Sequence, residues 1–246
     1  MRRRKIKGAD ERLLSYKHYI VNGMIDQKLP ENSEDNSKSI FDNRVPIENE
    51  IYNTLINDYK GNWSNVFKNN NPIHIEVGTG RGKFITTLAQ QNPDINYIAL
   101  EIKEEVLLRA VEKADDLKLS NIAFIWGNVE FFDLYFSDKE LSRIYINFCD
   151  PWPKKRYAKR RLTHSNFLEL YRKKLKNDGE INFKTDNRDL FEFSLNEISS
   201  NDWMLKNISL DLANSDFDFN VTTEYEDKFM SLGQAIYRLE AVDIRK

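Results

Sequence analysis

The chain has 246 residues, of which 40% are hydrophobic and 12% aromatic, with a formal net charge of -2; this composition supports a sizeable core and excludes a chain disordered throughout. Its one cysteine, Cys149, excludes a disulfide scaffold and a cysteine-rich zinc site and fits a reducing compartment. No apolar run approaches the roughly 18 residues that a membrane span needs, and the basic start lacks the apolar stretch of a secretory signal, so we expect a cytoplasmic protein without a membrane partner.

The small net charge conceals two basic segments. Residues 1–7 contain five Lys or Arg and no acid, and residues 150–176 contain ten Lys or Arg against Asp150 and Glu169. The rest of the chain is therefore acidic. Such asymmetry fits a polyanionic partner bound on one face. Basic side chains that gather on solvated helices give the same pattern, so charge alone favours neither explanation.

The first 70 residues differ in pattern from the remainder. Residues 11–20 have the spacing of a short helix, and residues 30–39 are rich in Ser, Asn and Glu, which is typical of a flexible polar loop. We expect residues 1–70 to form a basic N-terminal extension and residues 71–246 to form one domain.

Strand and helix patterns alternate from residue 71 onward. They predict strands at residues 72–77, 96–102, 121–128, 143–148 and 179–185, and helices at residues 83–90, 103–118, 163–176 and 189–199. The helix over residues 163–176 is expected to end near Asp178 and Gly179, which supply its C-cap. Residues 204–212 and 234–242 are strand-like and are joined by a long loop. This order predicts an α/β fold with a doubly wound, mostly parallel, Rossmann-like sheet that ends in an antiparallel hairpin.

A glycine-rich loop follows the first strand of this domain. Gly78, Gly80 and Gly82 follow Glu76 at alternate positions. Ligands of doubly wound sheets bind at the carboxyl ends of the strands, and glycine lets the backbone approach a ligand with no Cβ in the way. A turn that merely connects strand to helix is the alternative, which the ordered strands, helix and acids weaken.

Two further polar residues end the next two strands. Glu101 lies where a carboxylate can accept from both hydroxyls of a ribose, and Asn128 lies where an amide can reach an adenine edge. This order fits a dinucleotide or S-adenosylmethionine. The loop has Lys83 in place of the third glycine of a dinucleotide motif, and Glu76 suits a cationic amino acid better than a pyrophosphate. The residues therefore favour S-adenosylmethionine.

The fourth strand runs into a stiff, basic loop. Asp150 follows this strand, and Pro151 and Pro153 restrict the backbone on either side of Trp152, whose ring can stack on a base. Six Lys or Arg follow within residues 154–161. A basic run joined to a rigid loop at the ligand end of the sheet favours phosphate binding over a merely solvated helix face.

These motifs together resemble those of the bacterial tRNA (guanine-N7-)-methyltransferase family, TrmB. The matching segments, over about residues 70–240, are IEVGTGRG, the acid in ALEI, GNVEFF, NFCDPWPKKRYAKRRLT, INFKTDN and TEYEDKF. The resemblance implies a class I methyltransferase fold for residues 71–246, S-adenosylmethionine as cofactor, and methylation of N7 of the variable-loop guanine at position 46 of tRNA. It allows a possible homodimer.

The resemblance also implies roles for individual residues. Beside Gly78 and Gly80 of the loop, the cofactor-binding positions are Glu76, Glu101, Asn128 (where many members have Asp) and Asp150. Substrate-binding positions are Lys154, Asp186, Thr223, Glu224, Tyr225 and Glu226, and the RNA-contacting run is Arg156, Tyr157, Ala158, Lys159, Arg160 and Arg161. No metal is implied, and the three histidines have no metal-ligand spacing.

The chemistry of the implied reaction makes Asp150 the candidate catalytic residue. Guanine N7 is an acceptor with no proton at neutral pH, so transfer needs alignment rather than a general base. A carboxylate stabilises the positive charge that moves from sulfur to the purine, and Asp186 is the second candidate for this role. Asp186 as a helix cap and Tyr225 as a core residue are the plainer alternatives.

Other functions stay open at the level of sequence. The chain fits another S-adenosylmethionine-dependent RNA methyltransferase, or a non-catalytic RNA-binding module on a degenerate methyltransferase fold. A small-molecule methyltransferase or a dehydrogenase is a third alternative, but neither function explains the basic run at residues 154–161.

Overall fold

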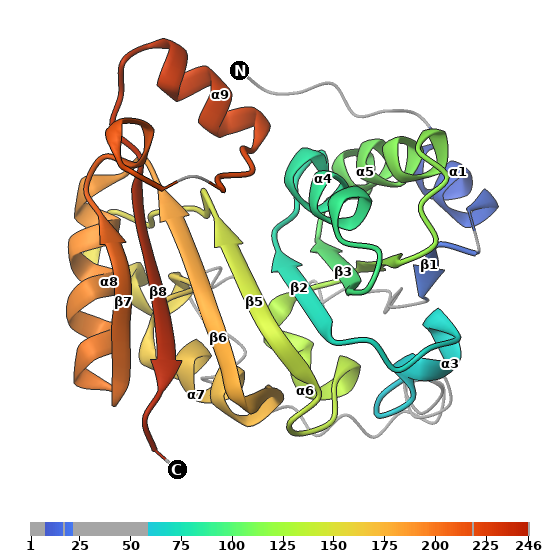
Figure 1. Ribbon diagram of the computed structural model, residues 1–246, viewed down its shortest axis with the longest axis horizontal. Helices are drawn as coiled ribbons and strands as arrows, with labels where there is room; N and C mark the ends of the chain where they lie inside the picture. Colours follow the sequence, from blue (N-terminus) through green and yellow to red (C-terminus); the bar gives the residue numbers. More distant parts are fainter. Residues whose placement is uncertain (1–7, 17, 22–58, 218, 246) are drawn as a thin grey trace.

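The computed structural model describes residues 8–16, 18–21, 59–217 and 219–245 (Figure 1). The predicted basic start at residues 1–7 and the predicted polar loop at residues 30–39 lie outside these ranges. Within them, no helix is long and apolar enough to cross a membrane.

One sheet forms the centre of the described structure, with strand order β1-β4-β3-β2-β5-β6-β8-β7 (Figure 1). Neighbours from β1 to β6 are parallel, whereas β8 runs antiparallel to both β6 and β7. This arrangement confirms the predicted doubly wound sheet and its terminal antiparallel hairpin. The strands are β1 (Ile20–Val21), β2 (Ile73–Val77), β3 (Asn96–Glu101), β4 (Ile122–Trp126), β5 (Leu141–Asn147), β6 (Leu175–Thr185), β7 (Trp203–Ser209) and β8 (Tyr237–Asp243).

Helices cover both faces of this sheet, and each face has its own hydrophobic cluster. Along β3, Tyr97 and Ala99 join one cluster while Ile98 and Leu100 join the other, because successive strand side chains point to opposite faces. Burial on both faces explains why the central strands are apolar throughout rather than alternating. One face carries α1 (Ala9–Ser15), α4 (Lys83–Gln91) and α5 (Glu104–Asp116), and the other carries α3 (Trp63–Phe67), α6 (Phe132–Tyr135), α7 (Ser165–Lys174) and α8 (Arg188–Ser200).

The chain changes direction across the sheet between β2 and β5. From β2 it continues outward to β3 and β4, and it then returns to β5 on the other side of β2. Val77 pairs with Ile146 near the carboxyl ends of these two strands. Because the helical connections leave in opposite directions there, a crevice opens at this edge, which is where such folds bind ligands.

The N-terminal segment differs from its prediction. The helix expected over residues 11–20 ends at Ser15, and Ile20 and Val21 form the strand β1 beside β4. The backbone N–H of Phe124 donates to the carbonyl of Tyr19 at 2.9 Å. The open edge of β4 thus offers backbone partners to these β-branched residues, an advantage that helical spacing alone does not reveal.

Two other segments also differ. The helix expected over residues 163–176 is α7, which ends at Lys174, and β6 starts at Leu175, so Asp178 and Gly179 lie inside a strand instead of capping a helix. The loop expected between the last two strands contains the helix α9 (Glu224–Ser231).

Truncation of Leu13 tests whether α1 belongs to the folded domain. Leu13 is 0% exposed in the cluster that α1 shares with α5, so Leu13→Ala is expected to lower the free energy of unfolding by about 2–5 kcal/mol in urea melts. The exposed neighbour Glu11 supplies the control, since Glu11→Ala is expected to change it by at most about 0.5 kcal/mol. Equal stability of the two variants would show that α1 is not docked.

Candidate active site

A cavity of about 610 Å³ lies at the carboxyl ends of the central strands, where the chain changes direction. This volume is within the range of small-molecule sites. Ten residues predicted from the sequence line it: Glu76, Gly78, Gly80, Glu101, Asn128, Asp150, Arg160, Thr223, Glu224 and Tyr225. The other predicted residues lie outside its lining: Lys154, Arg156, Tyr157, Ala158, Lys159, Arg161, Asp186 and Glu226.

The three glycines of the loop have different roles. All three have positive φ angles, between 60° and 79°. A Cβ on Gly78 or Gly80 would meet nothing within 4 Å, so these two leave open space in the cavity. A Cβ on Gly82 would lie 2.6 Å from the Cβ of Ala110 on α5. Gly82 therefore permits close packing of α4 on α5, while Gly78 and Gly80 leave room for a ligand.

Glu76 is a buried acid in the wall of the cavity, 1% exposed. Thr79 Oγ1 donates to Oε2 at 2.6 Å, and Asn147 Nδ2 donates to Oε1 at 2.9 Å. Burial raises the pKa of Glu76 to about 7, against the lowering effect of these hydrogen bonds and of the positive charge of Lys184. A cationic ligand group beside this carboxyl would stabilise its ionised form.

Glu101 and the glycine loop form one hydrogen-bonded unit. The backbone N–H of Gly80 donates to Glu101 Oε2 at 3.1 Å, and the N–H groups of Ile102 and Lys103 donate to Oε1 at 3.0 and 3.1 Å. Burial raises the pKa of Glu101 while these bonds lower it. The carboxylate is thus held at the end of β3 beside the loop, where ribose hydroxyls can reach it.

Asn128 lines the cavity at the end of β4 and also organises its own backbone. Its Oδ1 accepts from the N–H of Glu130 at 3.1 Å, which caps the short 3-10 helix η1 (Val129–Phe131). Gly127, directly before it, packs against Tyr135, whose hydroxyl would lie 2.2 Å from an added Cβ. This close approach holds the end of β4 in place.

The loop that carries Asp150 contains two residues with strained backbone conformations and is held by one arginine. Phe148 and Trp152 have positive φ angles of 53° and 42°, which non-glycine residues rarely adopt. Arg161 donates to the carbonyls of Pro151 at 3.1 Å and Trp152 at 3.0 Å. Asp150 is exposed at the cavity. Arg161 thus supports the loop, whereas the resemblance implied an RNA contact for it.

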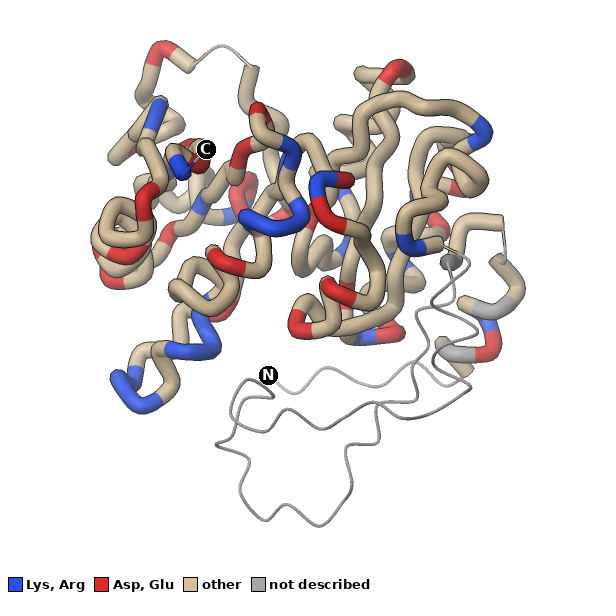
Figure 2. Tube along the Cα trace, turned by 90° about the horizontal axis from the view of Figure 1, so that it is seen from below, with Lys and Arg blue, Asp and Glu red and all other residues tan. Residues whose placement is uncertain are grey.

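The basic run continues from this loop as the 3-10 helix η2 (Lys155–Arg160). Arg160 lies over the ring of Trp152 at 4.9 Å, and Arg156 lies over Tyr157 at 4.8 Å. Lys154, Arg156 and Lys159 are exposed. Figure 2 shows Lys and Arg gathered on a projecting segment, with Asp and Glu spread over other parts of the chain. Exposed cations grouped in this way form the type of surface that binds polyanions.

The first turn of α9 completes the other wall of the cavity. Thr223 is its N-cap in a capping box with Glu226, a pattern that was visible in the sequence as T-x-x-E. The half-exposed ring of Tyr225 stacks on Phe148, with centroids 6.4 Å apart and planes 18° apart. Tyr225 is therefore a cavity residue rather than a core residue.

Glu226 and Asp186 lie differently from the other predicted residues. Glu226 is 0% exposed and forms an ion pair with Lys184 inside the protein. Asp186 is half-buried, and the alternative that it caps a helix is wrong, because Asn187 fills that role by accepting from the N–H of Leu190 at 2.8 Å. Sequence reasoning also missed Thr79, Asn147 and Lys184 as partners of the acids.

Comparison with known proteins agrees with this geometry. A family model described as "Putative methyltransferase" matches residues 70–239. Among solved structures, a 16S rRNA (adenine(1408)-N(1))-methyltransferase from Catenulisporales acidiphilia superposes with a TM-score of 0.54 at 13% identity, covering 76% of this chain and 92% of the other. The family model and the fold together place the chain among the class I methyltransferases.

Curated relatives narrow this class to one family. A tRNA (guanine-N(7)-)-methyltransferase of Clostridioides difficile (strain 630) is 60% identical over 241 residues, 98% of each chain. One of Bacillus subtilis (strain 168) is 51% identical over 183 residues, 74% of this chain and 86% of the relative. The chain belongs to the tRNA (guanine-N(7)-)-methyltransferase family, as the sequence motifs predicted.

The residues at the cavity fit S-adenosylmethionine, the cofactor of this class. A buried acid at Glu76 suits a cationic amino group, Glu101 suits a ribose, and the open space at Gly78 and Gly80 admits the ligand. The cofactor supplies a methyl group on a positively charged sulfur.

The raised pKa of Glu76 predicts a pH-dependent stability. The folded cofactor-free protein holds this proton more tightly than the unfolded chain, whose glutamate has the ordinary pKa of 4.5. The protonated Glu76 carboxyl therefore makes its full contribution to the free energy of unfolding below pH 4.5, and this contribution is lost as pH rises through about 7. Relative to Glu76→Gln, the wild type is expected to lose on the order of 2–3 kcal/mol of unfolding free energy over this range in urea melts. Parallel pH profiles for the two proteins would contradict this.

Proposed function

We propose that the chain transfers the methyl group of S-adenosylmethionine to N7 of a guanine in tRNA, the variable-loop guanine at position 46. One observation carries the proposal. Asp150 at the cavity and the exposed cations of η2 lie on one short segment. Two prolines and the hydrogen bonds of Arg161 restrain its backbone, so phosphates bound by the cations are held at a set distance from the cavity. Membership of the tRNA (guanine-N(7)-)-methyltransferase family supports it.

The reaction is a direct displacement. The lone pair of guanine N7 attacks the methyl carbon, the new N–C bond forms as the S–C bond breaks, and the bonding electron pair goes to sulfur. No proton has to leave before the attack. The protein's task is to hold N7 in line with the S–C bond, an alignment that can supply roughly 7–11 kcal/mol of the barrier.

The residues of the site divide this task. Glu76, Glu101 and Asn128 hold the cofactor, and Asp150 faces the positive charge that develops on the purine and stabilises it. The exposed ring of Tyr225 offers a stacking surface for a base beside the cavity.

The basic run and the half-buried Asp186 have the remaining roles. Lys154, Arg156 and Lys159 contact RNA phosphates, and Arg160 lies between these cations and the cavity. Asp186 stays a candidate substrate contact.

The intact cavity argues against a non-catalytic RNA-binding module, and the exposed cations argue against a small-molecule substrate. We place the reaction in the cytoplasm, in keeping with a tRNA substrate and a single cysteine. The possible homodimer and the division into an extension at residues 1–70 and a domain at residues 71–246 stay predictions.

Methyl incorporation tests the function. The full chain is incubated with S-adenosylmethionine labelled in its methyl group and a tRNA transcript, and the label is expected in 7-methylguanosine at the variable loop. The matched control is the same transcript with that guanine changed to adenine, which is expected to take up no label. Label retained in the control would refute the proposed position, and no label in either transcript would refute the activity.

Replacement of Asp150 tests its catalytic role. Asp150→Asn removes the negative charge and keeps the shape, so kcat is expected to fall roughly 100-fold while KM for tRNA changes by less than about 3-fold. Asp94→Asn, an exposed acid away from the cavity lining, serves as control and is expected to keep wild-type kcat. Turnover of Asp150→Asn near that of the wild type would reject the role.

A further inference from the structure

The helix α9 lies at the cavity and is attached to the sheet by a buried ion pair. Lys184, on β6, is 6% exposed, and Glu226, in the first turn of α9, is 0% exposed. The Nζ of Lys184 donates to Glu226 Oε2 at 2.6 Å, to the carbonyl of Val221 at 2.9 Å and to Asn220 Oδ1 at 3.1 Å. The three hydrogens of the ammonium group thus have three partners.

The carboxylate of Glu226 is likewise occupied within the protein. Its second oxygen accepts from Asn220, and its Oε2 faces the N–H of Thr223 at 3.4 Å in the capping box. Glu226 is absent from the lining of the cavity, although Thr223, Glu224 and Tyr225 before it all line the cavity. Its side chain therefore acts on the helix and does not present oxygens to a substrate.

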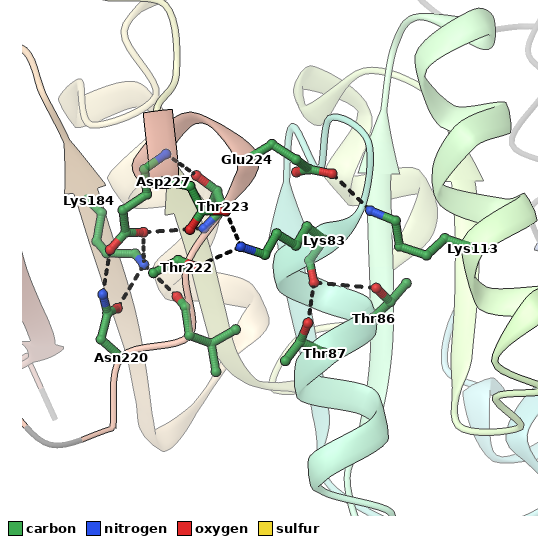
Figure 3. Close-up of polar contacts among 12 residues, drawn as sticks. Lys83, Thr86, Thr87, Lys113, Lys184, Asn220, Thr222, Thr223, Glu224 and Asp227 are labelled. Atoms are coloured by element: carbon green, nitrogen blue, oxygen red, sulfur yellow. Dashed lines mark hydrogen bonds and ion pairs between the residues drawn. The ribbon is translucent and has the colours of Figure 1, made fainter. Parts of the chain in front are cut away.

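Two other ion pairs attach α9 to the opposite half of the sheet, and both are partly exposed. Lys83 of α4 pairs with Asp227, and Lys113 of α5 pairs with Glu224 at 2.9 Å (Figure 3). Solvated pairs of this kind contribute little, roughly 0–1 kcal/mol, whereas removal of one member of a buried pair leaves an uncompensated charge. Of these three ion pairs, the buried one is therefore the pair whose disruption on one side costs most.

Lys184 also holds the opposite wall of the cavity through its backbone. Its carbonyl accepts from the N–H of Phe148 at 2.9 Å, two residues before Asp150. The ring of Phe148 stacks on Tyr225 of α9. Lys184 therefore contacts the Asp150 loop through its main chain and α9 through its side chain. The stacked rings of Phe148 and Tyr225 join the loop directly to α9.

We propose that Lys184 is a positioning residue for methyl transfer, and that Glu226 acts as its partner rather than as a contact to tRNA. Together they hold the first turn of α9 against the Asp150 loop, so that Tyr225 and Thr223 stay in the cavity wall when the guanine enters. This role rests on the proposed methyl transfer, and the wild-type rate in the assay above shows separately whether that transfer occurs.

A double-mutant cycle tests the pair. Lys184→Met and Glu226→Gln are each expected to lower kcat about 10-fold, where kcat is calculated per folded cofactor-binding site. KM for tRNA is expected to stay unchanged within about 2-fold. The double variant is expected to be no slower than the slower single variant, because the uncompensated charge is gone. Calorimetric titration with S-adenosylmethionine gives the concentration of folded sites, so that loss of folded protein does not count as loss of turnover.

The surface pair on the same helix supplies the matched control. Lys83→Met and Asp227→Asn are expected to change kcat by less than about 2-fold. If the buried variants give too little folded protein, Asn220→Ala removes one hydrogen-bond partner from each member of the pair and is expected to lower kcat about 3-fold at unchanged KM for tRNA.

Two results would overturn the role of Lys184. The first is wild-type kcat in Lys184→Met or, where that variant does not fold, in Asn220→Ala. The second is a Glu226→Gln variant whose loss is confined to a raised KM for tRNA and simply multiplies with that of Lys184→Met, as a direct contact between Glu226 and RNA would give.

Discussion

The cavity depends on the buried carboxyl of Glu76, which connects the two halves of the sheet where the chain changes direction. Glu76 is the last residue but one of β2 and accepts hydrogen bonds from Thr79 in the glycine loop and from Asn147 on β5. A buried acid without such partners would be costly, so the strand ends and the loop are held in one arrangement. Its raised pKa shows that burial still disfavours its charge, which makes this wall of the cavity receptive to a cation.

A second connection joins the Asp150 loop to α9 on the other side of the cavity. Phe148 leaves β5 in a strained conformation and is held by the carbonyl of Lys184, while the side chain of Lys184 holds α9. Arg161 fixes the following turn through the carbonyls of Pro151 and Trp152. Asp150 and the exposed cations of η2 are thus on one restrained segment. In the proposed function, this segment sets where a bound tRNA places its guanine.

The fold was largely predictable because its central strands and helices have regular periods in the sequence. The failures have local causes. Ile20 forms a strand because the edge of β4 is open beside it. The helix α9 was not predicted, although Thr223 and Glu226 have the spacing of a capping box. Its apolar pattern is weak, because among its residues only Glu226 is buried. Helix α7 passes directly into β6, so Gly179 caps nothing.

By itself the sequence determined the class of fold, the glycine loop, the acids at the strand ends and the family, because each is a local pattern of residue types and spacings. Only the tertiary structure decided which of those residues face the cavity. Glu226 and Arg161 stand in the same motifs as Tyr225 and Arg160, yet Glu226 pairs with Lys184 inside the protein and Arg161 holds a loop. The reason is that a charged side chain taken out of water is costly unless it is paired or hydrogen-bonded. Its direction therefore depends on partners that are distant in sequence.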